Sequence, residues 1–225
     1  MILASFDCEV DLFSHGGYRY VIGLDEAGRG PLAGPVVAAS VCVRYDFSHD
    51  VDNPLWRLVR DSKSLSEKQR DRAFDFVSEM FFVGVGQCDH ETVDRVNILQ
   101  ASFLAMKKSL VSLEQVMHRE GVGDFRHDHE GVILLVDGAM ELSNLSGAQR
   151  AVPQGDKYVR SIAAASIIAK VTRDRFIVQI AEKYPEYGFE RHKGYGTALH
   201  MEMLEKYGPC PIHRKSFGPV KKLLL

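Results

Sequence analysis

The chain has 225 residues and a mass of 25.2 kDa, and 45% of its residues are hydrophobic and 26% charged. This composition predicts a globular protein with one sizeable core and excludes a disordered or fibrous one. No apolar run reaches the roughly 18 residues that span a bilayer, and the start MILASFDCEVDLF lacks the basic residues of a secretory signal. We therefore expect a cytoplasmic protein without a membrane segment, whose four scattered cysteines are reduced thiols.

Positive charge is concentrated at the C-terminal end of the chain. Residues 191–225 hold seven Lys and Arg against two Glu, a net charge of +5, which leaves −7 for the other residues and gives the total of −2. A basic segment on an acidic body favours a polyanionic partner, because surface cations bind phosphate with release of counterions. A solvated basic face is the alternative interpretation.

Hydrophobic periodicity predicts alternating strands and helices. Ser66 and Gln69 match a helix capping box, and VILLV before Asp137 is typical of a buried strand. In chain order we expect an extension (1–17), then two strands (18–24 and 35–45) joined by a glycine-rich turn as a hairpin. A helix (66–80), a strand (81–88) and a long amphipathic helix (90–118) follow. The rest is a polar loop (121–130), a buried strand (132–136) and two helices (161–184 and 197–207). This order predicts an α/β protein with a mixed β-sheet flanked by helices.

Carboxylates follow two of the predicted strands. Asp25 and Glu26 come directly after VIGL, and Asp137 follows VILLV. Adjacent ionised carboxylates at the end of a buried strand repel each other and lose hydration, so they are costly unless a cation neutralises them. Oxygen ligands of this kind suit Mg²⁺ or Mn²⁺. The alternatives are acids that only cap a turn and a simple Asp-Gly turn.

Further candidates are less distinctive. Asp156 lies in a loop ahead of a helix, and Asp174 competes with it, although a helical aspartate between two arginines is more often ion-paired at the surface. The loop residues His127 and His129 are interpreted as solvated side chains, not metal ligands.

Two glycine-containing segments are candidates for substrate contact. Gly28-Arg29-Gly30 exposes backbone groups that a ribose 2′-hydroxyl could approach, although a tight turn also needs glycine. In H-K-G-Y-G-T, the Tyr195 ring could stack on a sugar or base, with His192 and Lys193 meeting phosphate. A glycine-rich loop with a surface tyrosine is the alternative.

Seven motifs occur together and in order: D-E-A-G-R-G, D-S-K-S-L-S, D-G after VILLV, G-D-K-Y, S-I-A-A-A-S-I-I-A-K-V-T-R-D, H-K-G-Y-G-T and H-R-K-S-F-G-P-V. This set, spread over about 200 residues, resembles bacterial ribonuclease HII. The resemblance implies a ribonuclease H-like fold with a helical, substrate-binding C-terminal extension. It also implies hydrolysis of RNA in RNA–DNA hybrids and cleavage on the 5′ side of a single ribonucleotide embedded in duplex DNA. The extension is too short for the additional N-terminal domain of the sister family, ribonuclease HIII.

The resemblance also implies roles for individual residues. Four carboxylates would bind two divalent ions, Mg²⁺ or Mn²⁺, and act in catalysis: Asp25, Glu26, Asp137 and Asp156. The G-R-G triplet would contact the ribose and its 3′ junction, and Tyr195 would stack on the following deoxyribose. Lys63, Ser166 and Lys170 lie in segments similar to substrate-facing ones, while Ala139 stands where many relatives have Asn.

Together these observations predict one structural unit made of an extension (residues 1–17), a catalytic domain (18–190) and a basic substrate-binding segment (191–225). We expect a monomer that acts on RNA–DNA hybrids and ribonucleotide-containing DNA and leaves 5′-phosphate and 3′-hydroxyl ends. The alternatives are a carboxylate-metal DNA nuclease without ribose selectivity and a hybrid-binding module without turnover.

Overall fold

The computed structural model describes residues 3–44, 46–47 and 53–224. Its centre is a five-stranded sheet in the order β3-β2-β1-β4-β5. The strands are β1 (Tyr20–Ala27), β2 (Val36–Arg44), β3 (Phe82–Cys88), β4 (Val132–Asp137) and β5 (Ala148–Val152). β1, β2 and β3 pair antiparallel, whereas β4 pairs parallel with both β1 and β5. The predicted mixed sheet and hairpin are confirmed, while β5 was not predicted.

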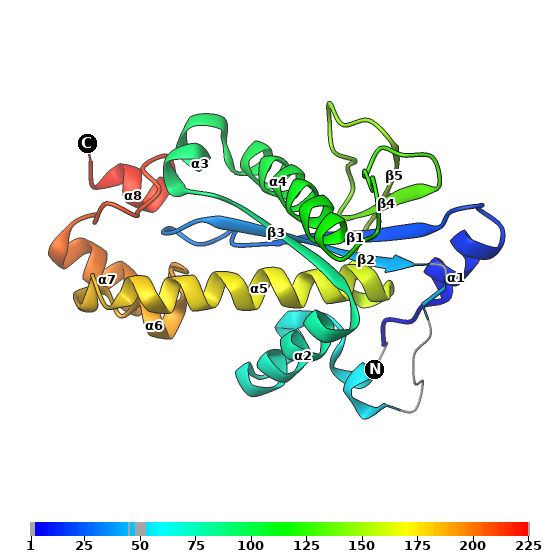
Figure 1. Cartoon of the computed structure of the whole chain (residues 1–225). Coiled ribbons are helices and arrows are strands. Elements are labelled where there is room, and N and C mark those ends of the chain that lie inside the picture. The colour runs from blue at the N-terminus through cyan, green and yellow to red at the C-terminus, as the bar shows by residue number, and fades with distance from the viewer. Residues whose placement is uncertain (1–2, 45, 48–52, 225) are drawn as a thin grey trace.

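Helices cover both faces of this sheet (Figure 1). Helix α4 packs on one face, and α5 with α2 packs on the other. The α-helices are α1 (Asp7–Ser14), α2 (Glu67–Met80), α3 (His90–Val96), α4 (Ile98–Arg119), α5 (Arg160–Ala181), α6 (Phe189–His192), α7 (Ala198–Tyr207) and α8 (Gly218–Lys222). Short 3-10 helices η1 to η4 cover Pro54–Leu58, Ser62–Ser64, Gly155–Lys157 and Pro185–Tyr187. No helix in the described ranges is long and apolar enough to cross a membrane.

Side-chain caps mark the beginnings of α2, α3, α4 and α7. Ser66 and Gln69 form the predicted capping box at the start of α2. The single helix predicted over 90–118 is wrong in one respect, because it is broken into α3 and α4 at Asn97. Asn97 has a φ of 69° and its side chain accepts a hydrogen bond from the Gln100 N–H, so it caps the second helix.

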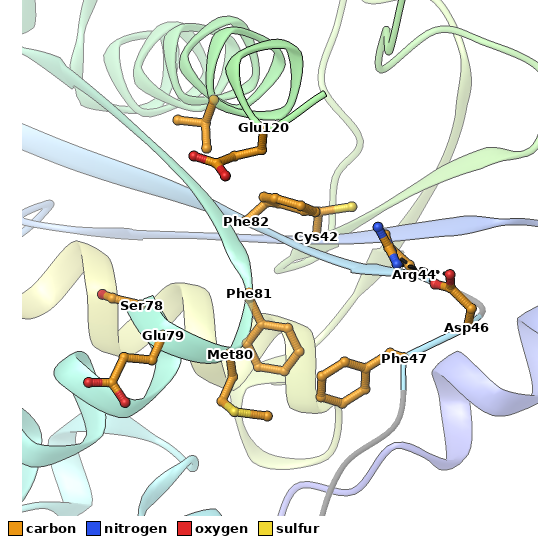
Figure 2. A pocket seen from close by; sticks show the side chains of 11 residues that line it. Cys42, Arg44, Asp46, Phe47, Ser78, Glu79, Met80, Phe81, Phe82 and Glu120 are labelled. Carbon is orange, nitrogen blue, oxygen red and sulfur yellow. Dashed lines mark hydrogen bonds and ion pairs between the residues drawn. The ribbon is translucent and has the colours of Figure 1, made fainter. Parts of the chain in front are cut away.

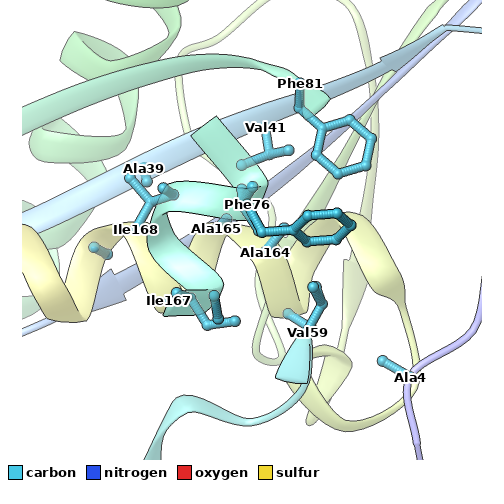
Figure 3. Packing of buried hydrophobic residues seen from close by; sticks show 14 of the residues in the cluster. Ala4, Ala39, Val41, Val59, Phe76, Phe81, Ala164, Ala165, Ile167 and Ile168 are labelled. Carbon is cyan, nitrogen blue, oxygen red and sulfur yellow. The ribbon is translucent and has the colours of Figure 1, made fainter. Parts of the chain in front are cut away.

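Helix α5 lies very close to the central strand. A Cβ at Gly23 would stand 2.2 Å from the carbonyl carbon of Ser161, so only glycine allows this approach. The face between α5, α2 and the sheet is filled by small and branched residues, with the Phe76 ring packed among them (Figure 3). This close packing places one row of α5 side chains beside the end of β1.

Helix α1 and the C-terminal helices α6 to α8 lie at opposite ends of the sheet (Figure 1). Ser5, before α1, forms a parallel bridge with Val159. At the other end, helices α6 to α8 enclose a cluster in which the His200 and His213 rings meet at 3.0 Å between their Nε2 atoms. The C-terminal segment contacts the loop after β1, because Ala33 and His213 form an antiparallel bridge.

Candidate active site

Two parallel strands bring the first carboxylates together. The β1–β4 register pairs Leu24 with Val136, so Asp25 and Asp137 follow at the same edge of the sheet. Asp25 is 5% exposed, and its Oδ1 accepts the Glu26 N–H at 2.7 Å. The strands run further than predicted: Asp25 and Glu26 lie inside β1, near its end, and Asp137 is the last residue of β4.

Burial and the charges of neighbouring acids make Asp25 hard to ionise, and burial does the same for Glu26. Burial raises the pKa of Asp25 well above its usual range, and the charges of Glu26 and Asp137 raise it further. Burial also raises the pKa of Glu26, although Arg29 opposes this shift through a contact of 3.1 Å between Nη1 and Oε1. The local electrostatics therefore favour a bound cation, which would relieve the repulsion.

Asp156 lies in η3, directly ahead of α5, and is buried. Burial raises the pKa of its carboxyl, and the nearby charges of Asp137 and Asp61 add to this effect. Lys63 lies close to the acids. Burial lowers the pKa of Lys63, but the charges of the surrounding carboxylates, chiefly Asp25 and Asp156, outweigh this effect and raise it. Asp156 is thus electrostatically linked to Asp137.

The donors fit a hard divalent cation. Asp137 Oδ1 is buried and has no hydrogen-bond partner in the described part of the chain, and carboxylate oxygens are the ligands that Mg²⁺ and Mn²⁺ prefer. Within residues 3–44, 46–47 and 53–224, no group of three or more His, Cys, Asp or Glu side chains is already arranged to hold an ion. Glu26 is instead engaged by Arg29, and Asp156 does not line the cleft shared by the other acids.

A cleft of about 300 Å³ joins the acids to the predicted sugar-reading loop. Its lining residues are Asp25, Glu26, Ala27, Gly28, Arg29, Gly30, Ser62, Lys63, Asp137, Ser166, Lys170 and Tyr195. The Tyr195 ring is 40% exposed and lies 3.5 Å from where a Gly30 Cβ would be. Lys170 Nζ is 5.5 Å from the centre of the same ring. Five segments that are far apart in sequence therefore meet at one surface.

Other candidates lie outside this cleft. His192 is buried, and its ring contacts the Tyr187 carbonyl and the Gly194 N–H, so it supports the Tyr195 loop and does not face phosphate. Lys193 Nζ donates to the Glu190 carbonyl. Asp174 is ion-paired with Lys170 at 2.8 Å, as its helical position predicted, but it is mostly buried.

The loop histidines also have protein partners. His127 Nδ1 contacts Glu114 at 2.7 Å, and His129 Nδ1 contacts the Glu130 carbonyl. His127 is thus not simply solvated as predicted, although in the described part of the chain neither residue belongs to a metal-binding group.

Two arginines that the sequence analysis did not single out organise the loop after β1. Arg173 is fully buried and donates to the carbonyls of Ala33, Pro35 and Lys193. Arg214 is also fully buried and donates to four further carbonyls of the loop, from Gly28 to Gly34. Both lie in the motifs quoted above, but sequence alone does not reveal that a motif arginine points inward.

A second hollow, of about 550 Å³, lies where β2 ends at Arg44 (Figure 2). Glu79 and Glu120 line it together with aromatic side chains. The carboxylate cleft lies at the other end of β2, where Ala38 pairs with Glu26. The hollow in Figure 2 therefore contributes nothing to the cleft.

Comparison with known proteins supports one family. A family model described as Ribonuclease HII matches residues 22–220. A ribonuclease HII of Caldicellulosiruptor bescii is 46% identical over 213 residues, which cover 94% of this chain and 92% of that protein. One of Syntrophobacter fumaroxidans is 48% identical over 208 residues, which cover 91% of this chain and 79% of that protein.

Solved structures share the fold. The ribonuclease H2 of Pyrococcus horikoshii OT3 matches with a TM-score of 0.64 at 26% identity, covering 91% of this chain and 96% of that one. A Bst-RNase HIII in complex with Mn²⁺ has a TM-score of 0.66 at 21% identity, covering 92% of this chain and 69% of that one. The predicted ribonuclease H-like fold is confirmed. Since the family model spans most of the sequence and the relatives match almost all of it, the chain belongs to the ribonuclease HII family and is a ribonuclease H.

Proposed function

We propose that this ribonuclease H hydrolyses the RNA strand of RNA–DNA hybrids and cuts on the 5′ side of single ribonucleotides embedded in duplex DNA. The observation that supports this proposal is the composition of the cleft. It places Asp25, Glu26 and Asp137 beside the Gly28–Gly30 loop and Tyr195. Acids repel phosphate unless cations occupy them, so acids next to a sugar-reading surface favour metal-assisted hydrolysis.

The residues that would hold two Mg²⁺ or Mn²⁺ ions are Asp25, Glu26, Asp137 and Asp156. When bound, such ions activate a water and offset the charge on the leaving 3′ oxygen. For its part, the chain orients and balances the acids: Arg29 holds Glu26, and the Ser166 hydroxyl favours the ionised form of Asp25. Lys63 supplies positive charge toward an approaching phosphate.

A single cleavage assay tests this function. The substrate is a DNA duplex with one ribonucleotide, incubated with and without Mg²⁺ or Mn²⁺, and the expected product is a metal-dependent nick on the 5′ side of the ribonucleotide. Product ends should be 5′-phosphate and 3′-hydroxyl. Asp137→Asn is the matched variant, because it removes one charge and keeps the shape of the side chain.

The same assay separates the alternatives. An all-DNA duplex of equal sequence stays intact if ribose is read and is cut if the protein is an unselective DNA nuclease. Equal cleavage of both duplexes would refute ribose selectivity. Binding of the ribonucleotide duplex without a metal-dependent nick would refute the catalytic proposal for these substrates.

A further inference from the structure

Arg214 lies between α7 and α8, and its guanidinium is fully buried against the loop after β1. Its nitrogens donate to four carbonyls, at 2.7 Å to Gly28, 3.2 Å to Arg29, 2.8 Å to Pro31 and 3.0 Å to Gly34. Among the described residues it has no carboxylate within ion-pair distance. Burial lowers the pKa of Arg214 to about 9, which shows that its buried charge lowers the stability of the folded protein.

Because Arg214 fixes these carbonyls, it also fixes the direction of the N–H groups in the same peptides. All described peptide bonds are trans, and in a trans peptide the C=O and the N–H point in opposite directions. The Gly28 carbonyl shares its peptide with the Arg29 N–H, and the Arg29 carbonyl shares its peptide with the Gly30 N–H. Both N–H groups therefore point away from Arg214.

The two N–H groups are available to a ligand. Arg29 and Gly30 are exposed and line the cleft, whereas Gly28 is buried. In the described part of the chain, neither N–H has a hydrogen-bond partner. The next N–H in the loop that could donate, that of Leu32, is already bonded to the Gly194 carbonyl at 2.8 Å. The loop is thus fixed from behind and leaves two adjacent donors facing the cleft.

We propose that Arg214 is a positioning residue for substrate recognition. Its guanidinium fixes the Gly28–Gly30 loop and polarises two of its peptide groups, so that the Arg29 and Gly30 N–H groups become aligned, strong donors to a backbone oxygen of the ribonucleotide. A carbonyl that accepts a hydrogen bond from a charged group becomes more polarised, and the N–H of the same peptide then donates a stronger hydrogen bond. This inference rests on the proposed function and assigns the ribose preference to a residue that does not touch substrate.

The first test compares Arg214→Lys with the wild type, both carrying Asp137→Asn to prevent cleavage. Lysine keeps the charge but lacks the planar fork that reaches several carbonyls. Fluorescence anisotropy gives the preference, which is the Kd for an all-DNA duplex divided by the Kd for the same duplex with one ribonucleotide. We expect this preference to fall about tenfold with the lysine, as loss of one to two hydrogen bonds predicts. Met117→Ala, a buried change in α4, controls for lost stability and should keep the preference.

A second measurement does not depend on a variant folding. In wild-type protein labelled with ¹⁵N-glycine, the Gly30 amide resonance should shift when the ribonucleotide duplex is added and should shift much less with the all-DNA duplex. If Arg214→Lys folds, its Gly30 amide proton should move upfield in the free protein, because the peptide is less polarised. The Met117→Ala protein should keep the wild-type shift.

Each outcome has a defined meaning. The role of Arg214 would be overturned if Arg214→Lys kept the wild-type preference or lost affinity equally for both duplexes. It would also be overturned if the Gly30 amide resonance did not shift more with the ribonucleotide duplex than with the all-DNA duplex. A wild-type protein that binds both duplexes equally, or does not cleave the ribonucleotide duplex with Mg²⁺ or Mn²⁺, would instead refute the proposed function itself.

Discussion

At the scale of single residues, the acidic cleft holds unfavourable electrostatics that a bound cation would relieve. Asp137 leaves one buried oxygen without a partner in the described part of the chain, and Asp25 is buried beside two further acids. An unsatisfied buried polar group costs about 1–3 kcal/mol. Because Asp25, Glu26 and Asp137 share one cleft, a bound cation there would both satisfy this oxygen and offset the repulsion, which supports a site for cations.

Replacing Asp25 with Asn should therefore abolish metal-dependent cleavage and stabilise the metal-free protein. Asn keeps an oxygen that can accept the Glu26 N–H, but it removes a charge whose pKa burial and repulsion raise. At neutral pH we expect a gain in the free energy of unfolding, because the folded protein no longer holds a charge in a buried site beside two other acids. Thermal unfolding in EDTA measures this gain, which should shrink toward acidic pH as Asp25 becomes protonated. A loss of stability at neutral pH would contradict the assignment.

Tyr195→Ala should reduce cleavage at a single embedded ribonucleotide more than cleavage of an all-RNA strand. The ring beside Gly30 can stack on the deoxyribose that follows, and stacking on an aromatic side chain is worth about 1–3 kcal/mol. The measurement is kcat/KM on two duplexes of equal length at fixed salt, because phosphate contacts weaken both alike as salt rises. Tyr195→Phe keeps the ring and serves as control. Equal losses on both substrates would leave Tyr195 as a general anchor.

At the scale of elements, sequence patterns predicted those that depend on local signals. The capping box at Ser66 appears as predicted, and the first predicted strand is present but continues through Asp25 to Ala27. The break at Asn97 was missed because the apolar period continues through it. Strand β5 has little hydrophobic alternation and is fixed by pairing with β4. The inward direction of Arg214 depends on contacts with residues almost 190 positions away, which no local pattern encodes.

Element position also distinguishes the two candidates for the fourth carboxylate. Asp156 lies in η3 and is coupled electrostatically to Asp137, whereas Asp174 lies more than three turns along α5 and pairs with Lys170. Asp156→Asn should lose metal-dependent turnover, while Asp174→Asn should retain most of it. Titration of Mn²⁺ against turnover for both variants checks this prediction. The reverse result would exchange the two assignments.

Helix α1 supports the segment that carries Asp156. Glu9 in α1 is fully buried, and its Oε1 accepts the Ser161 N–H at 2.7 Å, at the start of α5. Glu9→Ala leaves this N–H unsatisfied in the core, which costs about 1–3 kcal/mol. Burial also raises the pKa of Glu9, so we expect the net loss in the free energy of unfolding to be largest at acidic pH, where the change removes no buried charge. Denaturant titration measures the loss. Asp11→Ala, an exposed change in the same helix, should stay within about 0.5 kcal/mol of wild type.

At the scale of the whole molecule, the C-terminal helices close one end of the sheet. The C-terminal helices meet the body through buried histidines, and burial lowers the pKa of both His200 and His213 to about 4. Their rings are neutral in the folded protein near neutral pH, and one donates to the other across 3.0 Å. Arg214 follows directly in sequence, so this neutral cluster anchors the residue that holds the loop of the cleft.

These two groups of residues predict a maximum in the pH dependence of stability of the metal-free protein. Between the ordinary histidine pKa of about 6.5 and the lowered value of about 4, the unfolded chain binds more protons than the folded protein, so stability falls as pH falls through this range. The raised pKa values of Asp25, Glu26 and Asp156 act in the opposite direction, because the folded protein binds more protons above pH 4 and stability falls as pH rises.

Thermal unfolding across this pH range, with EDTA or with Mg²⁺, checks the balance between the two groups. In EDTA we expect the highest Tm at mildly acidic to neutral pH. Mg²⁺ should raise Tm above neutral pH, where the carboxylates are ionised and can bind it, and should have little effect near pH 4, where protons compete for the same oxygens. Asp25→Asn should flatten the alkaline side of the EDTA profile and weaken the effect of Mg²⁺, while leaving the acidic side unchanged. If Mg²⁺ stabilised the wild type and Asp25→Asn equally, the ion would bind elsewhere, and the four carboxylates would lose their proposed role as its ligands.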